Sequence, residues 1–518
     1  MRALLVAVGT RGDVQPAIAL ALELRKLGHE VRMCISPNFV DWAKRLGIDA
    51  RPMGVEMRMP ARSGGAPPMF TAEELRRLRE SMPDLIADQF DTIGAAVDGC
   101  DVIVGANAHQ YAGPSIAERA GVGCVTAVYA PNSLPSPDLA PPPPPGQPAQ
   151  PAAPTSIEER WHNTAKAWNE RALERINRNR VRLGMQPIAD VLEYVLTDHT
   201  WLAADPVLGP VPATPGRKVF QTGAWVLADR TPLPADLEAF LDGGEPPVLV
   251  GFGSMPADAP ASSMLIGAAR AAGRRVLVSR GWAGLDLIDN ATDCMAVGDV
   301  SHDLLFPRLA GVVHHGGAGT TTTAARAGVP QVITPMGGDQ FYWARRVVDL
   351  ELGATTAHSA MTQESLTTAL RDALAPAVAI RARALAERIR WDGATNAARQ
   401  LETEFLATTP GSPQRDAATR RVAIRSVSDI SAALGYSLKH RGLVLSEADL
   451  SPAFFELRSG FAGEVLQKFV NYGARMAIVL RDPKAHGERF SELVHEHRRH
   501  PVIRFFATEA EARQWLGA

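Results

Sequence analysis

Residues 314–340 form the densest group of side chains that could do chemistry. The segment reads HHGGAGTTTTAARAGVPQVITPMGGDQ, follows an apolar strand expected at residues 311–314, and leads into a helix expected from about Thr320. Glycines in such a turn let the backbone approach a diphosphate, and the free N–H groups and dipole of a helix start favour its negative charge. His315 and Thr320 can add side-chain donors. The segment predicts a phosphate site, with a glycine turn kept only for packing as the alternative.

Asp339 and Gln340 follow the next expected strand, residues 331–334. In a doubly wound sheet they would lie at the same carboxyl edge as the glycine turn. A carboxylate accepts hydrogen bonds from two adjacent hydroxyls and an amide both donates and accepts, so the pair suits a sugar. The alternative is that Asp339 caps a helix that begins before Phe341.

Near the start of the chain, Gly9-Thr10-Arg11-Gly12-Asp13 occupies the first strand-to-helix turn. Asp13 would lie at the carboxyl edge of a first half and face the second. Its carboxylate could take the proton of an attacking hydroxyl, and Arg11 could approach a departing diphosphate. The alternative is that Asp13 only caps the helix. A helix start also lowers the pKa of a carboxylate, which keeps Asp13 ionised but weakens it as a base, and burial by a bound acceptor would offset this.

These turns must be positioned by strands and helices, and the pattern of apolar residues predicts two domains that contain them. Short apolar runs that alternate with helical patterns predict parallel sheets covered by helices. The fold class is therefore α/β, with two doubly wound Rossmann-like domains. The expected strands lie at residues 3–8, 29–35, 101–105 and 124–129 in the first half, and at residues 247–252, 275–279, 311–314 and 331–334 in the second.

Proline-rich stretches divide the chain further. Residues 134–154 are too dense in proline to join a core and predict a surface loop, after which one helix is expected over residues 157–183 with Trp161 and Trp168 packed on one face. Residues 407–418 lose all periodicity and indicate a linker. The predicted domains are residues 1–215, 216–402 with a terminal helix returning to the first domain, a linker at 403–420, and a small α/β domain at 421–518.

In the small domain, the pattern predicts strands at residues 422–426, 476–480 and 503–506. It predicts helices at residues 428–434, 463–472 and 509–516.

Composition narrows the function classes. The 518 residues carry a formal net charge of −2, which gives no basic surface for nucleic acid. The four cysteines are far apart and match no zinc spacing, so reduced thiols and a cytoplasmic location are expected. Arg11 and Asp13 end the first apolar run too early for a signal peptide, and no run of about eighteen apolar residues predicts a membrane span.

Together these segments resemble the family 1 glycosyltransferases of the two-Rossmann (GT-B) arrangement, over roughly residues 1–402. The motifs that carry the likeness are Gly9 to Pro16, Gly28 to Val31, Gly251 to Met255, Ser279 to Trp282, His314 to Thr320, and Asp339-Gln340. The likeness extends to the glycopeptide-antibiotic enzymes through Leu134 to Pro137, Trp201 to Pro206, and Thr222 to Trp225.

The resemblance implies an inverting hexosyltransferase that takes a UDP- or dTDP-sugar, with no cofactor and no metal, and glycosylates a bulky natural-product aglycone. Asp13 would be the general base, although plant relatives pair a histidine base with an aspartate and this motif offers Asp13 alone. Asp339 and Gln340 would hold the donor sugar, Ser254 would cover the diphosphate, and the nucleobase would meet the backbone near Val300. The remaining donor-binding residues would be Arg11, Gly12, His315, Gly316, Gly317, Ala318, Gly319 and Thr320.

Loops at residues 53–72 and 131–160 are expected to select the acceptor. The segments Phe454 to Leu457 and Gly460 to Tyr472 resemble a small bacterial domain family without assigned function, compatible with ligand sensing, dimerisation or docking. Leu466, Phe469 and Val470 fit one buried helical face, while Glu464, Gln467 and Asn471 fit a solvated one.

Three alternatives to this function are a sterol or lipid glycosyltransferase, a nucleotide-sugar epimerase on the same scaffold, and a non-catalytic nucleotide-sugar-binding helper whose activity lies in residues 421–518.

Overall fold

The computed structural model describes most of the chain. Within it the chain forms two compact units, Met1–Leu406 and Ala407–Ala518, each of which is considered by itself. The described residues are 1–56, 84–107, 109–143, 155–255, 260–282, 284–405, 424–426, 429–439, 442–480 and 482–516. Most of the expected acceptor loop at 53–72, part of the loop at 131–160 and the linker at 407–418 lie outside these ranges.

The first half of the larger unit contains a seven-stranded parallel sheet in the order β3-β2-β1-β4-β5-β6-β7. Its interior strand β1 is fully buried from Ala3 to Ala7, because parallel strands are covered on both faces. The strands are β1 (Arg2–Ala7), β2 (Glu30–Ile35), β3 (Asp49–Pro52), β4 (Val102–Ala106), β5 (Gly123–Val128), β6 (Thr200–Leu202) and β7 (Val219–Gln221). The helices are α1 (Arg11–Lys26), α2 (Val40–Arg45), α4 (Leu85–Ala96), α5 (Gly113–Ala120), α6 (Ile157–Trp168), α7 (Glu174–Arg182) and α8 (Val191–Val195).

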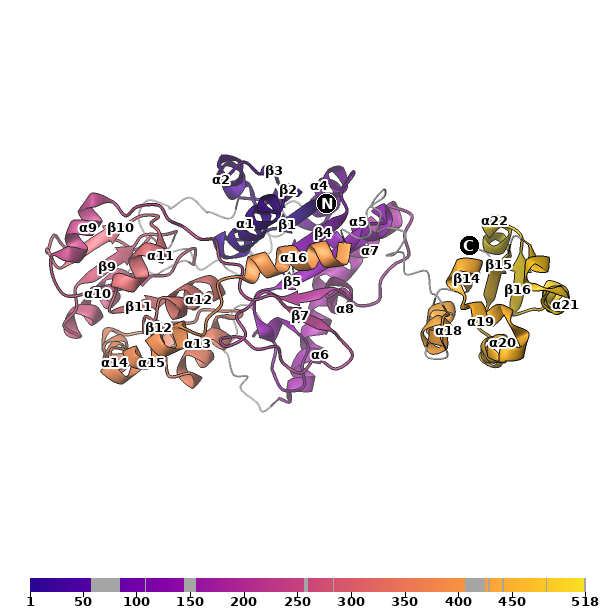
Figure 1. Ribbon diagram of the computed structural model, residues 1–518. Helices are drawn as coiled ribbons and strands as arrows, with labels where there is room; N and C mark the ends of the chain where they lie inside the picture. Colours follow the sequence, from indigo (N-terminus) through magenta and orange to yellow (C-terminus); the bar gives the residue numbers. More distant parts are fainter. Residues whose placement is uncertain are drawn as a thin grey trace. The chain divides into compact units, whose positions relative to one another are not determined.

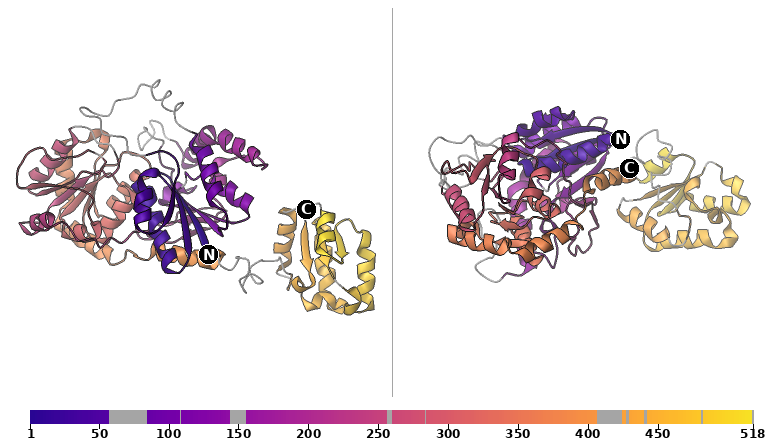
Figure 2. Two further views of the ribbon diagram at one scale, coloured as in Figure 1. Left: turned by 90° about the horizontal axis from the view of Figure 1, so that it is seen from above. Right: turned by 60° about the vertical axis from the view of Figure 1, so that its left-hand side comes forward.

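The second half repeats this plan with a six-stranded parallel sheet in the order β10-β9-β8-β11-β12-β13. Its strands are β8 (Val248–Gly251), β9 (Val276–Ser279), β10 (Cys294–Val297), β11 (Gly311–His314), β12 (Gln331–Ile333) and β13 (Gly353–Thr355). Its helices are α9 (Ala235–Asp242), α10 (Ala261–Ala271), α11 (His302–Leu305), α12 (Ala318–Arg326), α13 (Gln340–Asp349), α14 (Gln363–Ala373) and α15 (Pro376–Ala386). The prediction of two doubly wound Rossmann-like halves is confirmed, and the two views of Figure 2 show each sheet with its own helices.

Helix α16 (Gly393–Phe405) follows the second half in sequence but packs on the first. Ala397, Ala398 and Leu401 share one buried cluster with Leu20 and Leu24 of α1. Figure 1 shows α16, in orange, lying across the indigo and violet elements of the first half. The end of the unit is thereby joined to its beginning.

The helix expected over residues 157–183 is interrupted. A π-helical turn at Asn169–Leu173 separates α6 from α7. The helical backbone is nevertheless continuous over residues 157–182, and periodicity alone gives no sign of the π turn. Trp161 and Trp168 both pack against the first-half core, as expected, and the Trp161 Nε1 donates to the Leu139 carbonyl at 2.8 Å.

The smaller unit has a parallel three-stranded sheet, β14-β15-β16, around a core that includes Phe454, Phe469 and Phe490. Its strands are β14 (Leu443–Ser446), β15 (Met476–Val479) and β16 (Ile503–Phe506). Its helices are α18 (Asp429–Lys439), α19 (Pro452–Phe455), α20 (Phe461–Asn471), α21 (Glu488–Glu496) and α22 (Glu509–Leu516). Among the described residues of either unit, no helix is both long and apolar enough to cross a membrane.

The predicted strand at 422–426 is wrong within the described residues, because Ile424 makes only an isolated bridge to Leu450. The strand that pairs with β15 on the side opposite β16 is β14, which the sequence analysis missed. Leu466 and Phe469 are buried as predicted, whereas Val470 is 37% exposed, because α20 turns it towards solvent.

Candidate functional site

The predicted site segments share one structural position, directly after the carboxyl ends of parallel strands. Asp13 lies in the first turn of α1, after β1. Ser254 follows β8, Val300 follows β10, His315 follows β11, and Asp339 follows β12. Ligands of doubly wound sheets bind at this edge, which is where the sequence analysis placed these residues.

Asp13 is held by hydrogen bonds to both carboxylate oxygens. Its Oδ2 accepts from the Thr10 backbone N–H at 2.8 Å and lies 3.3 Å from the Thr10 hydroxyl, while its Oδ1 accepts from the Asn107 amide at 2.5 Å. The helix N-cap is Thr10, so Asp13 occupies the third helical position and closes a capping box. Asp13 therefore does cap the helix, but only through Oδ2. Its Oδ1 makes no bond to the helix start and accepts from Asn107 instead.

The environment of Asp13 also changes its acidity. Burial raises the pKa of the carboxyl above its ordinary value, and the hydrogen bonds from Asn107 and Thr10 oppose that rise. Gly9 makes room for the side chain, since a Cβ on Gly9 would lie 2.1 Å from Asp13 Oδ2 and its φ is +145°. A partly desolvated carboxylate with a raised pKa is better suited to accept a proton than a free aspartate.

The glycine turn after β11 is fixed by His314. This buried histidine meets Gln331 through Nε2 at 3.0 Å and accepts the Gly316 N–H on Nδ1 at 3.1 Å. Gly316 has φ of +92°, and Gly317 is the N-cap of α12, so the first N–H groups of that helix point out of the turn. The turn has the backbone donors that an anion site needs.

His315 leads into this turn as a neutral side chain. Burial lowers its pKa to about 4, so at neutral pH the ring offers a single N–H donor. Its ring lies between two loops, because a Cβ on Gly253 would be 3.3 Å from Cε1 and a Cβ on Gly317 would be 2.6 Å from Nε2. Its Nδ1 is buried and has no partner among the described residues. Thr320 lies in the first turn of α12.

Asp339 stands at the N-cap position of α13 but makes no side-chain cap bond. Instead its Oδ2 accepts from the Trp343 Nε1 at 3.0 Å. Burial raises the pKa of Asp339 to about 6, with the Trp343 bond opposing and the charge of Asp13 adding to the rise. The influence of Asp13 places the two carboxylates within electrostatic reach of each other, one from each half.

Gln340 and Ser254 are placed by their loops. The Gln340 Oε1 accepts from the backbone of Met336 at 2.7 Å and of Gly337 at 3.2 Å, which leaves its amide nitrogen to contact a ligand. Ser254 follows Gly253, whose carbonyl accepts the Trp282 N–H at 2.8 Å. The loops after β8 and β9 are thus joined beside the glycine turn.

Arg11 lies where the two halves meet, and so do two aromatic side chains. The Arg11 guanidinium is 3.1 Å from Asp299 and stands over the Trp42 ring at 5.2 Å. Phe39 of the first half stacks on Trp282 of the second with centroids 5.8 Å apart. The Arg11 side chain contacts the loop that ends at Val300, rather than the glycine turn.

The structure adds residues that the sequence analysis missed. Asn107 and His109 follow β4 and lie near Asp13. Asn107 donates a hydrogen bond to Asp13, and the His109 ring lowers the pKa of Asp13 when it is protonated, although burial lowers the pKa of His109 itself. The buried Tyr129 hydroxyl donates to the Asp13 carbonyl at 3.0 Å, and Trp168 stacks on His109 at 5.5 Å. Only the position of Asn107 and His109 directly after an expected strand could have drawn attention to them.

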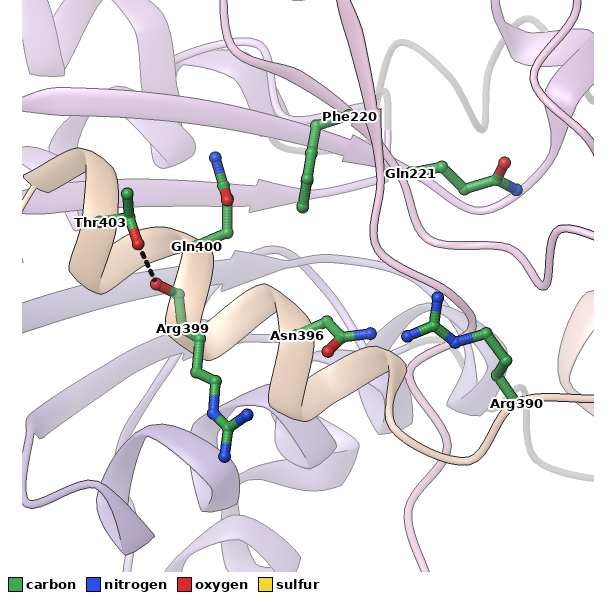
Figure 3. Close-up of a pocket in the computed structure, with 7 residues that line it drawn as sticks. All are labelled: Phe220, Gln221, Arg390, Asn396, Arg399, Gln400 and Thr403. Atoms are coloured by element: carbon green, nitrogen blue, oxygen red, sulfur yellow. Dashed lines mark hydrogen bonds between the residues drawn. The ribbon is translucent and has the colours of Figure 1, made fainter.

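A pocket of about 370 Å³ lies apart from this site, on α16 and β7 (Figure 3). Phe220, Arg390 and Arg399 are among its lining residues, and the Thr403 hydroxyl beside it donates to the Arg399 carbonyl at 3.0 Å. It contains none of the residues expected to bind donor or acceptor.

Comparison with known proteins assigns the chain to a family. Residues 3–134 match the glycosyltransferase family 28 N-terminal domain, and residues 286–402 match the erythromycin biosynthesis protein CIII-like C-terminal domain. Residues 417–516 match a domain of unknown function, DUF4180, in agreement with the expected small domain.

Named relatives cover the larger unit. Glycosyltransferase GtfE of Amycolatopsis orientalis is 45% identical over 415 residues, 80% of this chain and 100% of the relative. Vancomycin aglycone glucosyltransferase of the same organism is 44% identical over 403 residues, 77% of this chain and 97% of the relative. The solved glycosyltransferase of kitacinnamycin has a similar fold, with a TM-score of 0.57 and 20% identity over 78% of this chain and 98% of that one. The chain therefore belongs to the family 1 glycosyltransferases of the two-Rossmann (GT-B) fold, alongside enzymes named for glycopeptide antibiotics, and carries a DUF4180 domain at its C-terminal end.

Proposed function

We propose that the chain is an inverting glycosyltransferase that moves a hexose from a UDP- or dTDP-sugar to a hydroxyl of a bulky natural-product aglycone, of the glycopeptide or polyketide type. The observation that carries the proposal is the half-buried Asp13 carboxylate, which is held by Thr10 and Asn107 and whose charge helps to raise the pKa of Asp339 in the other half. A base and a sugar-binding carboxylate on opposite halves suit a reaction between two bound substrates.

In the proposed reaction, Asp13 takes the proton of the acceptor hydroxyl as its oxygen attacks the anomeric carbon. The bond from that carbon to the diphosphate breaks in the same displacement, so an α-linked donor gives a β-glycoside. The amides of Gly317 to Thr320, with the neutral His315, would stabilise the departing diphosphate. Arg11 would have to exchange Asp299 for a diphosphate oxygen to take part.

Two observations support the proposed class of acceptor: the name of one relative, and a group of aromatic side chains in the first half of the larger unit. One relative of the chain is an enzyme named for vancomycin aglycone. Beside Asp13, His109, Tyr111 and Trp168 form an aromatic group, with Trp168 stacked on His109 and edge-on to Tyr111. Such a surface favours a large aromatic acceptor over a small polar one.

A thermal-shift screen with UDP, dTDP, GDP and their sugar conjugates tests donor binding, because a ligand of the folded state raises the melting temperature by mass action. We expect a shift with UDP or dTDP species. No shift with any nucleotide would contradict the donor site.

The roles assigned to Asp13 and Asp339 are tested by turnover. Turnover is measured as the nucleoside diphosphate released from UDP-glucose or dTDP-glucose with vancomycin aglycone as acceptor. We expect Asp13→Ala and Asp339→Ala to lose turnover, while Asp13→Ala still gives the nucleotide thermal shift. Product formed by the purified chain alone would exclude the non-catalytic helper. Normal turnover in Asp13→Ala would show that the base is another group.

A further inference from the structure

A count of hydrogen-bond sites on Asp13 singles out one lone pair. A carboxylate has about four acceptor sites, two on each oxygen. Oδ2 faces two donors, the Thr10 N–H at 2.8 Å and the Thr10 hydroxyl at 3.3 Å. Oδ1 faces one, the Asn107 amide at 2.5 Å. The remaining site of Oδ1 is therefore the one open to a substrate proton.

Asn107 is held in an unusual conformation to make this contact. Its φ of +74° is one of only two positive values among the non-glycine residues that the structure describes. Its backbone N–H donates to the Ala127 carbonyl of the neighbouring strand at 2.7 Å, which fixes the residue at the end of β4. Backbone strain of this kind persists where the surrounding structure enforces it, and it gathers at functional sites.

We propose that Asn107 is a positioning residue for the general base, holding Asp13 by the oxygen that accepts the substrate proton and thereby fixing its remaining lone pair toward the acceptor. The proposal rests on the function proposed above. An ionised carboxylate attracts the amide N–H and repels the amide oxygen, so this contact also sets which end of the Asn107 side chain faces Asp13.

The contact has a consequence for acidity. Burial raises the pKa of Asp13, and the hydrogen bond from Asn107 is the largest of the interactions that lower it. Loss of the amide should raise the pKa further, so that a smaller share of Asp13 is ionised at a given pH. Activity that needs the ionised base should then begin at a higher pH.

Two substitutions remove the amide without disturbing the backbone. Asn107→Gly keeps the left-handed conformation, which glycine adopts without a steric penalty. Asn107→Asp also tolerates it, but places a second carboxylate against Oδ1. Tyr129→Phe is the matched control, because it removes a bond to the Asp13 carbonyl and none to its carboxylate.

The experiment is the pH dependence of kcat/KM for nucleoside diphosphate release from UDP-glucose or dTDP-glucose with vancomycin aglycone, which counts both transfer and donor hydrolysis. We expect the acid limb of Asn107→Gly to move up by about one pH unit, and that of Asn107→Asp to move further, since two facing carboxyls share a proton. Tyr129→Phe should keep the wild-type limb. All three should keep the nucleotide thermal shift.

Wild-type acid limbs in both Asn107 variants, with Asp13→Ala inactive, would overturn the positioning role and leave the proposed function intact. Full turnover in Asp13→Ala would instead overturn the base, and the role of Asn107 with it. A loss of kcat/KM equal at every pH would mean that Asn107 only shapes the turn, which also contradicts the proposal.

Discussion

At the scale of single residues, the space around Asp13 is set by a glycine. A Cβ on Gly9 would meet the Asp13 Oδ2 at 2.1 Å, and the φ of +145° disfavours any side chain. We expect Gly9→Ala to displace the carboxylate and lower kcat by about 100-fold, the size of effect that a 1 Å misplacement of a reacting group produces.

Gly94→Ala is the control for that substitution. Gly94 lies inside α4, where an added Cβ would make an ordinary contact of 3.7 Å with Ile116. It should leave kcat unchanged and stabilise the fold by up to about 1 kcal/mol, because alanine is the better helix former. Equal activity in both alanine variants would contradict the role of Gly9.

Trp343 should control the acidity of Asp339. Its Nε1 donates to the carboxylate and opposes a pKa that burial has raised to about 6. Trp343→Phe removes that donor, so the pKa should rise and more of Asp339 should be protonated near neutral pH. The KM for the donor should then increase more at about pH 6.5 than at about pH 8.5. A packing defect alone would raise KM equally at both values.

At the scale of elements, α16 is tied to the first half by a titratable pair. His199 Nδ1 lies 3.1 Å from Glu404, and this contact raises the pKa of His199 while burial opposes it. Because the pKa of His199 is higher in the folded state than in the unfolded state, its contact with Glu404 stabilises the fold fully below the unfolded pKa of 6.5. That stabilisation is lost as the pH rises through the folded-state pKa.

His199→Gln should therefore lower the free energy of unfolding more at about pH 5.5 than at about pH 8.5, by less than about 1 kcal/mol since the pair is half exposed. Urea unfolding at the two pH values measures it. Arg178→Gln, which breaks the exposed pair with Glu174, is the control and should show no such pH dependence. A His199→Gln effect that is the same at both pH values would contradict the assignment.

Elements with a one-sided or fully buried apolar pattern were predictable from sequence. β11 and β16 lie at the residues expected, because each is a mostly apolar run. α22 also lies where it was expected, although it is mostly polar and buries only Ala512. Helix α21 was missed although Phe490, Leu493 and Val494 have the spacing of one helical face, because the helix is short and the rest of it is polar. The pairing of Asn107 with Asp13 could not be predicted either, since it joins the residue after β4 to the first turn of α1, and only the strand order brings the two together. The turn that carries Asp13 was predictable, whereas the partners of its carboxylate were not.

At the scale of the whole molecule, the two units have separate hydrophobic cores. The cluster around Phe454 and Phe469 contains only residues of the smaller unit. We expect calorimetry of the full chain to show two transitions, of which a bound nucleoside diphosphate raises only the one that belongs to residues 1–406. A single transition that moves as a whole with nucleotide would contradict this.

The packing of α16 on α1 also bears on how the protein is made. The ribosome completes α1 by residue 26, but the helix that covers it ends only at residue 405. At cellular rates of synthesis, roughly 20 to 75 seconds separate the two. During that interval Leu20 and Leu24 lack the α16 side of their core, so a nascent chain interrupted before α16 presents an apolar helix face to chaperones and proteases, and the first sheet reaches its final state only after the second has been translated.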